Sequence, residues 1–582
     1  MAIAEKLMQR HTKSSRTSRV GACTALTLSL LMSGMSVAQA KIDDTAVYQP
    51  VAPTIDQARA NILIARQLQF THFRNLGISD ELSGDVFDAY LKYLDGQRIY
   101  LSQKDIELLA RAKSRLGSAL KTGQLQPGFE IYNLVQQRII ERLQFALNVI
   151  DNGLDELDFN TDERIRVDRS KADWEPDQEA LDALWIKRIK NAVLAQRLNG
   201  TEDDTIKDNL RRRYEGQLKR AYQARSEDAF QAYMNAFAGM WDPHTSYFSP
   251  RTSENFNINM SLSLEGIGAV LQSDNEYTKV VRLVPGGPAS KQGQLQPADR
   301  IVSVTQDDEE KPVNVIGWRL MDVVQMIRGD KGTKIKLDIL PAQNAPGSPP
   351  EHLEFVRDLI QLEDQAAKLE QVDVNDGEQR HTYSVISIPS FYSNIRQVRA
   401  NGGKLVATTH DVEELLKEVK KSNSEGLILD LRGNGGGYLD EAISLTGLFI
   451  DQGPVVQVVS KPNRRQVLKD REAGVAYDGP VVVLIDRYSA SASEIFAGAI
   501  SDNQRGILLG TTTFGKGSVQ SLIDLKDGSS LKVTVAEWLI PSGQSIQDNG
   551  ITPHEIIETS EAEFEEDIDP VLNRALEILN KE

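Results

Sequence analysis

Three segments in the second half of the chain carry groups that could do chemistry. Arg432-Gly-Asn-Gly-Gly-Gly437 is a glycine run, Asp486-Arg-Tyr-Ser-Ala-Ser-Ala-Ser-Glu494 is a hydroxyl cluster, and Gly510-Thr-Thr-Thr-Phe-Gly-Lys-Gly517 holds one lysine between two glycines. Each segment follows a short apolar run that is typical of a buried strand. Ligand sites in α/β proteins lie beyond the carboxyl ends of the strands. We therefore expect the three segments to meet at one edge of a sheet.

Ser491 stands at the expected start of a helix, three residues before Glu494. This spacing fits the N-cap of a capping box, which is a purely structural role. It also fits a nucleophile, because a helix start offers N–H groups and partial positive charge to an oxyanion. In that interpretation the N–H groups of Gly437 and Ala492 would form the oxyanion hole. The residues alone do not decide among the serines at 489, 491 and 493.

A serine nucleophile needs a base, and Lys516 is the candidate. The histidines lie away from the three segments. A lysine can act as a base only if burial or a nearby positive charge lowers its pKa. A single loop lysine is usually a solvated cation, but its coincidence with the hydroxyl cluster and the glycine run favours a catalytic role.

The segment from Gly510 to Lys516 also matches the start of a phosphate-binding P-loop, G-x-x-x-x-G-K. The next residue should be Ser or Thr to hold magnesium, but it is Gly517. The loop should also open a helix, whereas residues 518–525 alternate like a strand. Nucleotide binding is therefore disfavoured.

The surrounding pattern changes twice along the chain. Residues 41 to about 245 have helical periodicity, a segment of short apolar runs with one amphipathic helix follows, and strands alternate with helices from about 380. The last pattern predicts a largely parallel core sheet. The predicted helices are 131–150, 178–198, 317–328, 410–421, 439–450, one from about 491, and 569–579. Patterns that resemble capping boxes predict two further helix starts, at 102–105 and 201–204. The predicted strands are 383–389, 426–431, 481–485 and 507–509, and 341–350 is predicted as a linker.

Composition excludes several classes of protein. The chain has 582 residues, of which 40% are apolar and 26% charged, as in ordinary multidomain globular proteins. The formal net charge is -17, with 66 basic and 83 acidic residues. A broad nucleic-acid-binding surface is not expected, because phosphate binding needs clustered Lys and Arg.

Residues 1–40 have the layout of a secretory signal peptide. A basic stretch precedes a weakly apolar run, which ends in Ala38-Gln39-Ala40, an A-x-A cleavage site. The alternative, a membrane anchor, would be short for a bilayer span of about 20 residues. Cleavage after Ala40 would remove Cys23, the only cysteine, and so exclude disulfides and thiolate chemistry. We expect no integral membrane span in the mature chain and a periplasmic location, with peripheral attachment to the inner membrane left open.

At the hydroxyl cluster and the lysine loop, the chain resembles the tail-specific protease, or C-terminal processing peptidase, family of serine peptidases. The resemblance is closest to the long periplasmic members from Gram-negative bacteria, and it rests on the Ser-Ala-Ser-Ala-Ser-Glu run followed by Thr-Phe-Gly-Lys-Gly. It implies Ser491 as nucleophile, Lys516 as general base, Gln520 as the residue that orients the lysine, and Asp502 as a supporting residue. It also implies oxyanion donors at Gly437 and Ala492, and neither a metal nor another cofactor.

Residues 259–343 resemble a PDZ domain, a small β-barrel with a helix, in which Leu264-Glu-Gly-Ile-Gly268 matches the carboxylate-binding loop. The N–H groups of Gly266, Ile267 and Gly268 could hold a terminal carboxylate, and strand 269–272 could pair with a substrate tail. The pocket for the last side chain is expected to be lined by Leu264 and Ile267, with Val323, Val324 or Ile327 from the helix. The alternative is a small β-barrel that serves only as a spacer.

Together these observations predict a multidomain α+β protein with a helical N-terminal domain, a PDZ domain and an α/β catalytic domain with a Ser-Lys site. The expected divisions are a signal peptide (1–40), a helical cap (41–205), a linking segment (206–258), the PDZ domain (259–343), the peptidase domain (344–558) and an acidic tail with a short helix (559–582). We expect an ATP-independent periplasmic endopeptidase that captures apolar C-terminal tails of unfolded or marginally stable proteins; an envelope adaptor protein is a further expected partner. The alternative is a noncatalytic PDZ adaptor.

Overall fold

The computed structural model describes residues 48–309, 311–344, 348–376, 379–402, 404–461, 464–470, 473–558, 560, 563 and 568–581. The predicted signal peptide, 1–40, lies outside these residues. None of the helices in the described ranges combines the length and the apolar character that crossing a bilayer requires.

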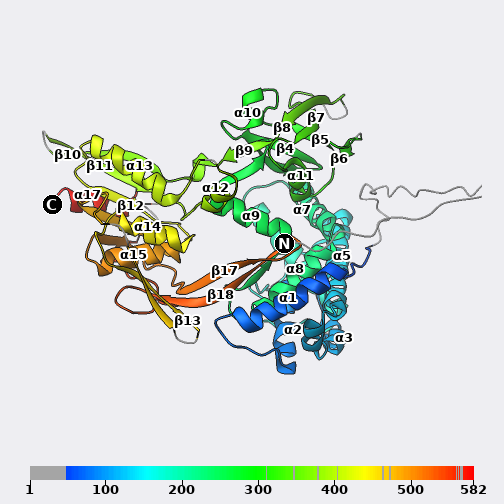
Figure 1. Cartoon of the computed structure of the whole chain (residues 1–582). Coiled ribbons are helices and arrows are strands. Elements are labelled where there is room, and N and C mark those ends of the chain that lie inside the picture. Colours follow the sequence, from blue (N-terminus) through cyan, green and yellow to red (C-terminus); the bar gives the residue numbers. More distant parts are fainter. Residues whose placement is uncertain are drawn as a thin grey trace, which may run out of the picture. The chain divides into compact units, whose positions relative to one another are not determined.

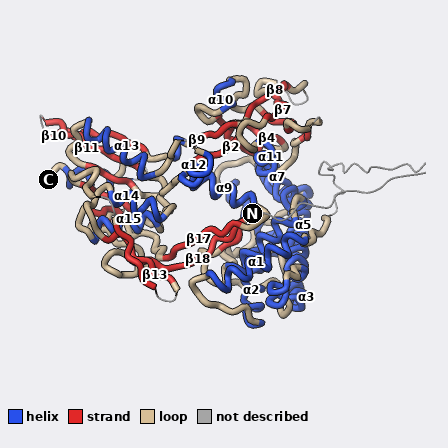
Figure 2. Tube along the Cα trace, viewed as in Figure 1, coloured by secondary structure: helices blue, strands red, loops and turns tan. Residues whose placement is uncertain are grey.

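Helices dominate the described chain as far as residue 261 (Figure 2). They are α1 (Ile55–Thr71), α2 (Asp80–Leu94), α3 (Gln103–Lys113), α4 (Leu116–Thr122), α5 (Gln126–Asn152), α6 (Gln178–Leu198), α7 (Asp203–Tyr222), α8 (Ser226–Ala238) and α9 (Pro250–Ser261), with the 3-10 turn η1 (Leu154–Glu156) and the short strand β1 (Ser246–Phe248). The predicted helix 131–150 is confirmed as part of α5, and the predicted helix 178–198 coincides with α6.

The two predicted helix starts have different outcomes. Ser102 caps α3 and forms a capping box with Asp105, as expected. The helix start predicted at 201–204 is confirmed, since α7 begins at Asp203, but the capping box expected there is absent, because the residue before the helix is Glu202, which makes no side-chain cap. The backbone N–H of Thr201 turns back instead to the Gln196 carbonyl, and this bond closes the end of α6.

The helical part is tied to a strand near the other end of the chain. Strand β1 pairs antiparallel with β18 (Ser530–Leu539), so that Tyr247 lies opposite Leu531. Leu531 and Val533 belong to the same apolar core as Phe230 and Trp241. The turn that precedes β1 therefore lies next to β18, in the second half of the chain.

A separate small sheet follows α9. Its order is β3-β4-β5-β7-β8, with β6 paired to β5, while β2 pairs with β9. The elements are β2 (Ser263–Gly266), β3 (Ala269–Asp274), β4 (Tyr277–Leu283), α10 (Pro288–Gln292), β5 (Arg300–Gln306), β6 (Val313–Asn314), α11 (Leu320–Ile327), β7 (Lys334–Leu340), β8 (Glu351–Val356) and β9 (Asp358–Gln361). The predicted helix 317–328 is confirmed as α11.

The segment 341–350, predicted as a linker, connects two strands of this sheet. Strands β7 and β8 pair antiparallel from Ile339–Glu351 to Lys334–Val356. The sheet therefore extends beyond residue 343, where the prediction ended the module. A composition rich in Pro and Gly, which suggested a linker between domains, is equally compatible with a connection between two paired strands.

The core sheet of the second half has the order β10-β11-β12-β15-β16-β19 and is parallel from β11 onward, as predicted. A short 3-10 turn, η2 (Glu363–Gln365), precedes it. Its strands are β10 (Lys368–Asp376), β11 (Gln379–Ser387), β12 (Leu427–Asp430), β15 (Val481–Ile485), β16 (Ile507–Gly510) and β19 (Glu555–Ile556). The helices around it are α12 (Ile395–Asn401), α13 (Thr408–Lys421), α14 (Leu439–Gly447), α15 (Ala492–Asp502) and α17 (Pro570–Leu579).

Alternate residues of the strands face opposite layers of helices. Leu429 and Val483 join a core with residues of α13, α14 and α15, whereas Ile428 and Val482 join a core with α17. The predicted C-terminal helix is confirmed. Rather than belonging to a tail, it covers one face of the core sheet, which would otherwise be exposed to water.

A second, antiparallel sheet adjoins the core sheet. It contains β13 (Pro454–Ser460), β14 (Arg464–Lys469), β17 (Ser518–Asp524) and β18, together with β1. Figure 1 shows β17 and β18 as two long neighbouring strands that reach the helices of the first part. The segment after Lys516 is thus a strand and opens no helix, as expected for a chain without a P-loop.

Candidate active site

The glycine run, the hydroxyl cluster and the lysine loop follow three adjacent strands and meet at one sheet edge, as predicted. In register, Asp430 of β12 lies beside Leu484 of β15, and Ile485 of β15 lies beside Gly510 of β16. All three strands are parallel, so the segments leave the sheet on the same side.

Asn434 joins the glycine run to the hydroxyl cluster. Its side chain is buried and donates to the Ile388 carbonyl (2.7 Å), while its Oδ1 accepts from the N–H of Gly436 (2.8 Å). Its own carbonyl accepts from the N–H of Ala490 and from the hydroxyl of Ser493, each at 2.9 Å. One buried amide residue therefore fixes the distance between the two segments.

Glycine is required where these two segments touch. Gly436 has φ +102°, and a Cβ there would lie 2.9 Å from the Ser491 Cβ and 3.1 Å from the Ala492 nitrogen. Gly437 has φ +155°, and its Cβ would lie 2.1 Å from the Phe391 carbonyl oxygen. Only a residue without a side chain allows this approach. The segments that carry Gly437 and Ala492 are thereby in contact.

The three serines of the cluster have different environments. Ser489 and Ser493 are buried, and their hydroxyls donate to the carbonyls of Leu431 (2.8 Å) and Asn434 (2.9 Å). Ser491 is half-buried, with φ +57° and ψ -112°. Such backbone conformations cost about 1–3 kcal/mol for a non-glycine residue and cluster at functional sites. Ser491 is thus distinct from its neighbours in both exposure and backbone strain.

Glu494 binds the backbone of both the serine segment and the lysine loop. It is 0% exposed, and its Oε2 accepts from the N–H groups of Ser491 (2.7 Å) and Lys516 (2.9 Å). Its Oε1 accepts from the Thr513 hydroxyl (2.7 Å) and the Gly515 N–H (2.6 Å). The Ser-x-x-Glu spacing predicted only a local cap, and the reach to the lysine loop was missed.

The side chain of Lys516 lies in a largely desolvated position. Burial lowers its pKa to about 8, and the positive charge of Lys532 adds to this lowering, whereas Glu494 and Asp242 oppose it. Its backbone carbonyl accepts from the indole N–H of Trp538 (3.1 Å). At pH 7 about one lysine in ten would then be a neutral amine, roughly 300 times more than for a lysine with an unshifted pKa.

Gln520 lies on β17, directly opposite Thr534 of β18. Its Nε2 donates to the hydroxyls of Ser518 (2.8 Å) and Thr534 (3.2 Å). With the amide nitrogen held in this way, Oε1 is the atom through which the side chain can accept a further hydrogen bond.

Asp502 is not brought together with Ser491 or Lys516. It is exposed at the last residue of α15, a helix of 11 residues and therefore about 16 Å long. Its Oδ2 accepts from the N–H of Ser542 (2.8 Å), in the turn after β18. Asp502 therefore contacts the turn after β18, at the opposite end of α15 from Ser491.

The predicted tail-binding loop lies at the end of the small sheet. Ile267, Val323 and Ile327 are buried in its core, while Leu264 and Val324 are half-buried. Gly268 has φ +79°, and a Cβ on Gly266 would lie 3.8 Å from the Arg328 Cα, so the loop adjoins the end of α11. Strand β3, which follows the loop, is the terminal strand of the sheet order.

A hydrogen-bonded group that the sequence did not predict reaches Gln520 from the helical part. It consists of His72, Asp242, Thr245 and Thr534. The sequence indicated only that the helical pattern ends at about residue 245.

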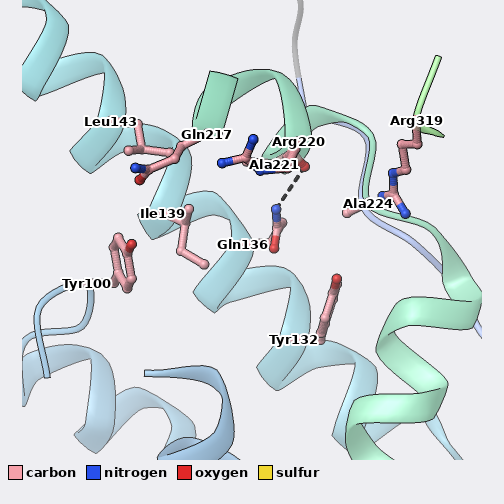
Figure 3. Close-up of a pocket in the computed structure, with 10 residues that line it drawn as sticks. All are labelled: Tyr100, Tyr132, Gln136, Ile139, Leu143, Gln217, Arg220, Ala221, Ala224 and Arg319. Carbon is pink, nitrogen blue, oxygen red and sulfur yellow. Dashed lines mark hydrogen bonds between the residues drawn. The ribbon is translucent and has the colours of Figure 1, made fainter. Parts of the chain in front are cut away.

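A cavity of about 270 Å³ lies in the helical part, between α5 and α7 (Figure 3). Gln136 projects into it and donates to the Ala221 carbonyl (2.8 Å). None of the predicted site residues lines this cavity. It is therefore separate from the chemistry of the sheet edge.

Three family models match the chain. They are described as "Tail specific protease N-terminal domain" (residues 64–251), "PDZ domain" (255–340) and "Peptidase family S41" (382–557). The last range contains the whole of the sheet edge described above.

The chain is also similar to individual proteins, of which the first below shows its family. The chain is 40% identical over 494 residues to a tail-specific protease of Haemophilus influenzae, which covers 83% of this chain and 68% of the relative. It is 33% identical over 368 residues to the carboxy-terminal processing protease CtpA of Bacillus subtilis, covering 62% and 71% of the two chains. A crystal structure of the PDZ domain of a carboxy-terminal protease from Vibrio cholerae, in complex with a peptide, is 50% identical, covers 17% of this chain and all of that one, and has a TM-score of 0.17.

Proposed function

The chain belongs to the tail-specific protease family of S41 peptidases and is a serine endopeptidase, and on this premise we propose that Ser491 is its nucleophile and Lys516 its general base. The observation that carries the proposal is the shared carboxylate of Glu494, which accepts from the backbone N–H groups of both residues. The alternative function, a noncatalytic PDZ adaptor, is therefore rejected.

The proposed reaction uses a neutral lysine. The Nζ of Lys516 accepts the hydroxyl proton of Ser491 as Oγ attacks the peptide carbonyl. The resulting ammonium then gives this proton to the leaving amine, and an acyl-enzyme ester remains. Water attacks the ester while the same amine takes a proton from it, and the resulting ammonium returns this proton to Oγ of Ser491 as the ester bond breaks and the peptide acid leaves. The lowered pKa of Lys516, to about 8, supports this role, because a base near the operating pH is the most effective.

The tetrahedral intermediate needs hydrogen-bond donors for its oxyanion. We assign these to the N–H groups of Gly437 and Ala492, which belong to segments in contact at Gly436. Ala492 is also the first residue of α15, where the helix dipole favours negative charge.

Two further residues support the base in this proposal. Gln520 orients Lys516 through Oε1, consistent with an amide nitrogen already bonded to Ser518 and Thr534. Asp502 acts only indirectly, because it holds the Ser542 turn at the far end of α15.

We assign capture of the substrate tail to the PDZ domain. The N–H groups of Gly266, Ile267 and Gly268 would bind the terminal carboxylate, and β3 would accept the tail as an added strand. The half-buried Leu264 and Val324 would contact the last side chain, above a floor that contains Ile267 and Ile327. This arrangement favours an apolar C-terminal residue.

The proposed location is the periplasm, after removal of residues 1–40, with peripheral association with the inner membrane and an envelope adaptor protein as further possibilities for the same chain. Proposed substrates are unfolded or marginally stable proteins with apolar tails. In this proposal the protease cleaves these substrates in the periplasm without ATP.

One experiment tests both the dyad and the tail recognition. The purified chain without residues 1–40 is mixed with an unfolded polypeptide that ends in an apolar tail, in the absence of ATP and added metal, and fragments are identified by mass spectrometry. We expect cleavage by the wild type, none by Ser491→Ala or Lys516→Arg, and strongly reduced cleavage of the same polypeptide with an amidated C-terminus. Arginine cannot supply a neutral base at this pH.

Matched controls lie at exposed positions on and just after β17, the strand that follows Lys516. Ser521→Ala on β17 and Lys526→Arg after it change the same chemical groups away from the sheet edge and should cleave like the wild type. Full activity of Lys516→Arg would refute the base assignment. Equal cleavage of the amidated polypeptide would refute carboxylate capture but leave the dyad intact.

A further inference from the structure

The turn between α8 and β1 contains a buried carboxylate, that of Asp242, to which the proposed peptidase reaction assigns no role. Asp242 is 9% exposed and lies against His72, which is fully buried just after the end of α1. The two residues are 170 positions apart in sequence. Buried ionisable pairs are costly unless they are hydrogen-bonded, and they recur at functional sites.

Both carboxylate oxygens of Asp242 accept hydrogen bonds. Oδ1 accepts from the N–H groups of His244 (2.6 Å) and Thr245 (3.0 Å), and Oδ2 accepts from the Thr245 hydroxyl (2.8 Å). Oδ2 also pairs with Nε2 of His72. Because Nδ1 of His72 accepts from the N–H of Arg74 (2.8 Å), the hydrogen-bond pattern assigns the imidazole proton to Nε2, which donates to Asp242.

The network continues from Asp242 to Gln520. Thr245 Oγ1 accepts from the N–H of Thr534 (3.2 Å) and lies 3.5 Å from its hydroxyl oxygen. The Thr534 hydroxyl in turn accepts from Nε2 of Gln520 (3.2 Å). The N–H of Phe73, next to His72, donates to the Thr534 carbonyl (2.7 Å), so the same strand residue is held from two sides.

The last contact of this path shows which atom of the Gln520 amide faces it. The hydroxyl oxygens of Thr534 and Ser518 both accept from Nε2 of Gln520. Because the amide nitrogen makes both contacts, Oε1 of Gln520 points away from them.

We propose that Asp242 is a positioning residue of the peptidase, whose buried carboxylate, through Thr245 and Thr534, fixes the orientation of the Gln520 amide and with it the direction in which the amine of Lys516 is held. The inference rests on the proposed role of Lys516 as base. The helical part then contributes to catalysis through His72 and Asp242, in addition to any role in admitting substrate.

The charge of Asp242 also acts on the pKa of Lys516, which provides a second way to test its role. Four charged or titratable side chains act on Lys516 or are acted on by it: Glu494 from α15, Asp242 and His244 from the turn, and Lys532 from β18. Burial would raise the pKa of Asp242, but hydrogen bonds from His72, Thr245, the His244 backbone and Thr534 bring it well below its usual value. Asp242 is therefore ionised at neutral pH and acts on Lys516 in the direction opposite to Lys532.

Steady-state kinetics of the full mature chain test the positioning role. Thr534→Val keeps the shape of the side chain but removes the oxygen that receives Gln520, whereas Thr534→Ser keeps that oxygen. We expect Thr534→Val and Asp242→Asn to lower kcat by up to about 100-fold, as misplacement of a reacting group does, with KM for a tailed polypeptide unchanged. Thr534→Ser should retain most of the wild-type kcat.

The pH dependence of kcat/KM separates positioning from general damage to the fold. Removal of the negative charge in Asp242→Asn should move the acid limb to lower pH. Removal of the positive charge in Lys532→Met should move it to higher pH. Opposite shifts are specific to two charges that act on one base, and a purely structural defect would not produce them.

The outcomes are distinguishable. Wild-type kcat in Thr534→Val, together with an inactive Lys516→Arg, would overturn this inference and leave the proposed function standing. Full activity in Lys516→Arg would overturn the proposed function itself. If Asp242→Asn fails to fold by circular dichroism, Thr534→Val decides the question, because it is nearly isosteric and removes no charge. A low kcat in Thr534→Ser equal to that in Thr534→Val would also overturn the inference.

Discussion

The backbone N–H groups of Ser491 and Lys516 donate to the same carboxylate oxygen of Glu494, at 2.7 and 2.9 Å. A serine at a helix start and a lysine in a loop after the next strand are thus held by one buried anion. The anion also accepts from Thr513 and Gly515, so it fixes the entire lysine loop relative to the helix. This relationship makes Glu494 the first target for mutation.

Glu494→Gln should lower both activity and stability. The amide keeps only one oxygen, so its NH₂ group would face N–H donors, and a buried hydrogen-bonded group left unsatisfied costs about 1–3 kcal/mol. We expect a lower melting temperature and a fall in kcat of roughly 100-fold. Calorimetry and steady-state kinetics measure the two effects. Glu537→Gln, an exposed change on β18, is the control and should alter neither; wild-type kcat in Glu494→Gln would contradict the tethering role.

The reaction should accelerate as the pH rises from 6 to 9. Burial lowers the pKa of Lys516 to about 8, so the neutral base is scarce below this pH and dominant above it. Below the pKa, kcat/KM should fall about tenfold for each pH unit. Initial rates with a short peptide substrate measure this profile, and fluorescence of the folded protein confirms that no unfolding accompanies it. A profile that is flat from pH 6 to 9 would contradict a lysine base.

Alanine substitutions in the glycine run should have position-specific effects. Gly436→Ala places a methyl group 2.9 Å from the Ser491 Cβ, and Gly437→Ala places one 2.1 Å from the Phe391 carbonyl oxygen. Both residues also have positive φ, so we expect loss of most activity. A Cβ on Gly435 would meet nothing within 4 Å, which makes Gly435→Ala the matched control. Equal activity of all three variants would show that the close approach is unimportant.

The C-terminal helix should stabilise the catalytic domain through one acidic residue. Asp569 caps α17 and also pairs with Arg432, which is bonded in addition to Asp430. Asp569→Ala removes the cap, so we expect a loss of about 1–2 kcal/mol in the free energy of unfolding. Asp569→Asn retains a capping oxygen and should lose less. Urea unfolding measures both, and equal losses would assign the effect to the ion pair alone.

Tail recognition should be separable from cleavage chemistry. Val324→Asp puts a charge into the proposed pocket for the last side chain, so KM for an apolar-tailed polypeptide should rise about tenfold or more, with little change in kcat. Met321→Asp, an exposed position on the same helix, is the control. Titration of a fluorescent tail peptide into both variants measures binding directly. Unchanged binding by Val324→Asp would move the pocket elsewhere.

Local sequence patterns predicted the elements well. The apolar run 481–485 and the periodic segment 178–198 coincide with β15 and α6, because period and flanking residues are properties of contiguous sequence. The meeting of three segments at one sheet edge also followed, since parallel strands end on the same side. The sequence pattern gave the wrong prediction where one composition fits two structures. The Pro-rich segment between β7 and β8 was predicted as a linker between domains, but it connects two paired strands of one sheet.

The sequence by itself determined the types of residue available for a Ser-Lys peptidase and the order in which they reach the sheet edge. Only the tertiary structure showed that Ser491 is less buried than Ser489 and Ser493, placed Asp502 at the far end of α15, and linked His72 and Asp242 to Gln520 through Thr245 and Thr534. The physical reason is that burial and long-range hydrogen bonds depend on how distant elements pack, and no local period or motif encodes that packing.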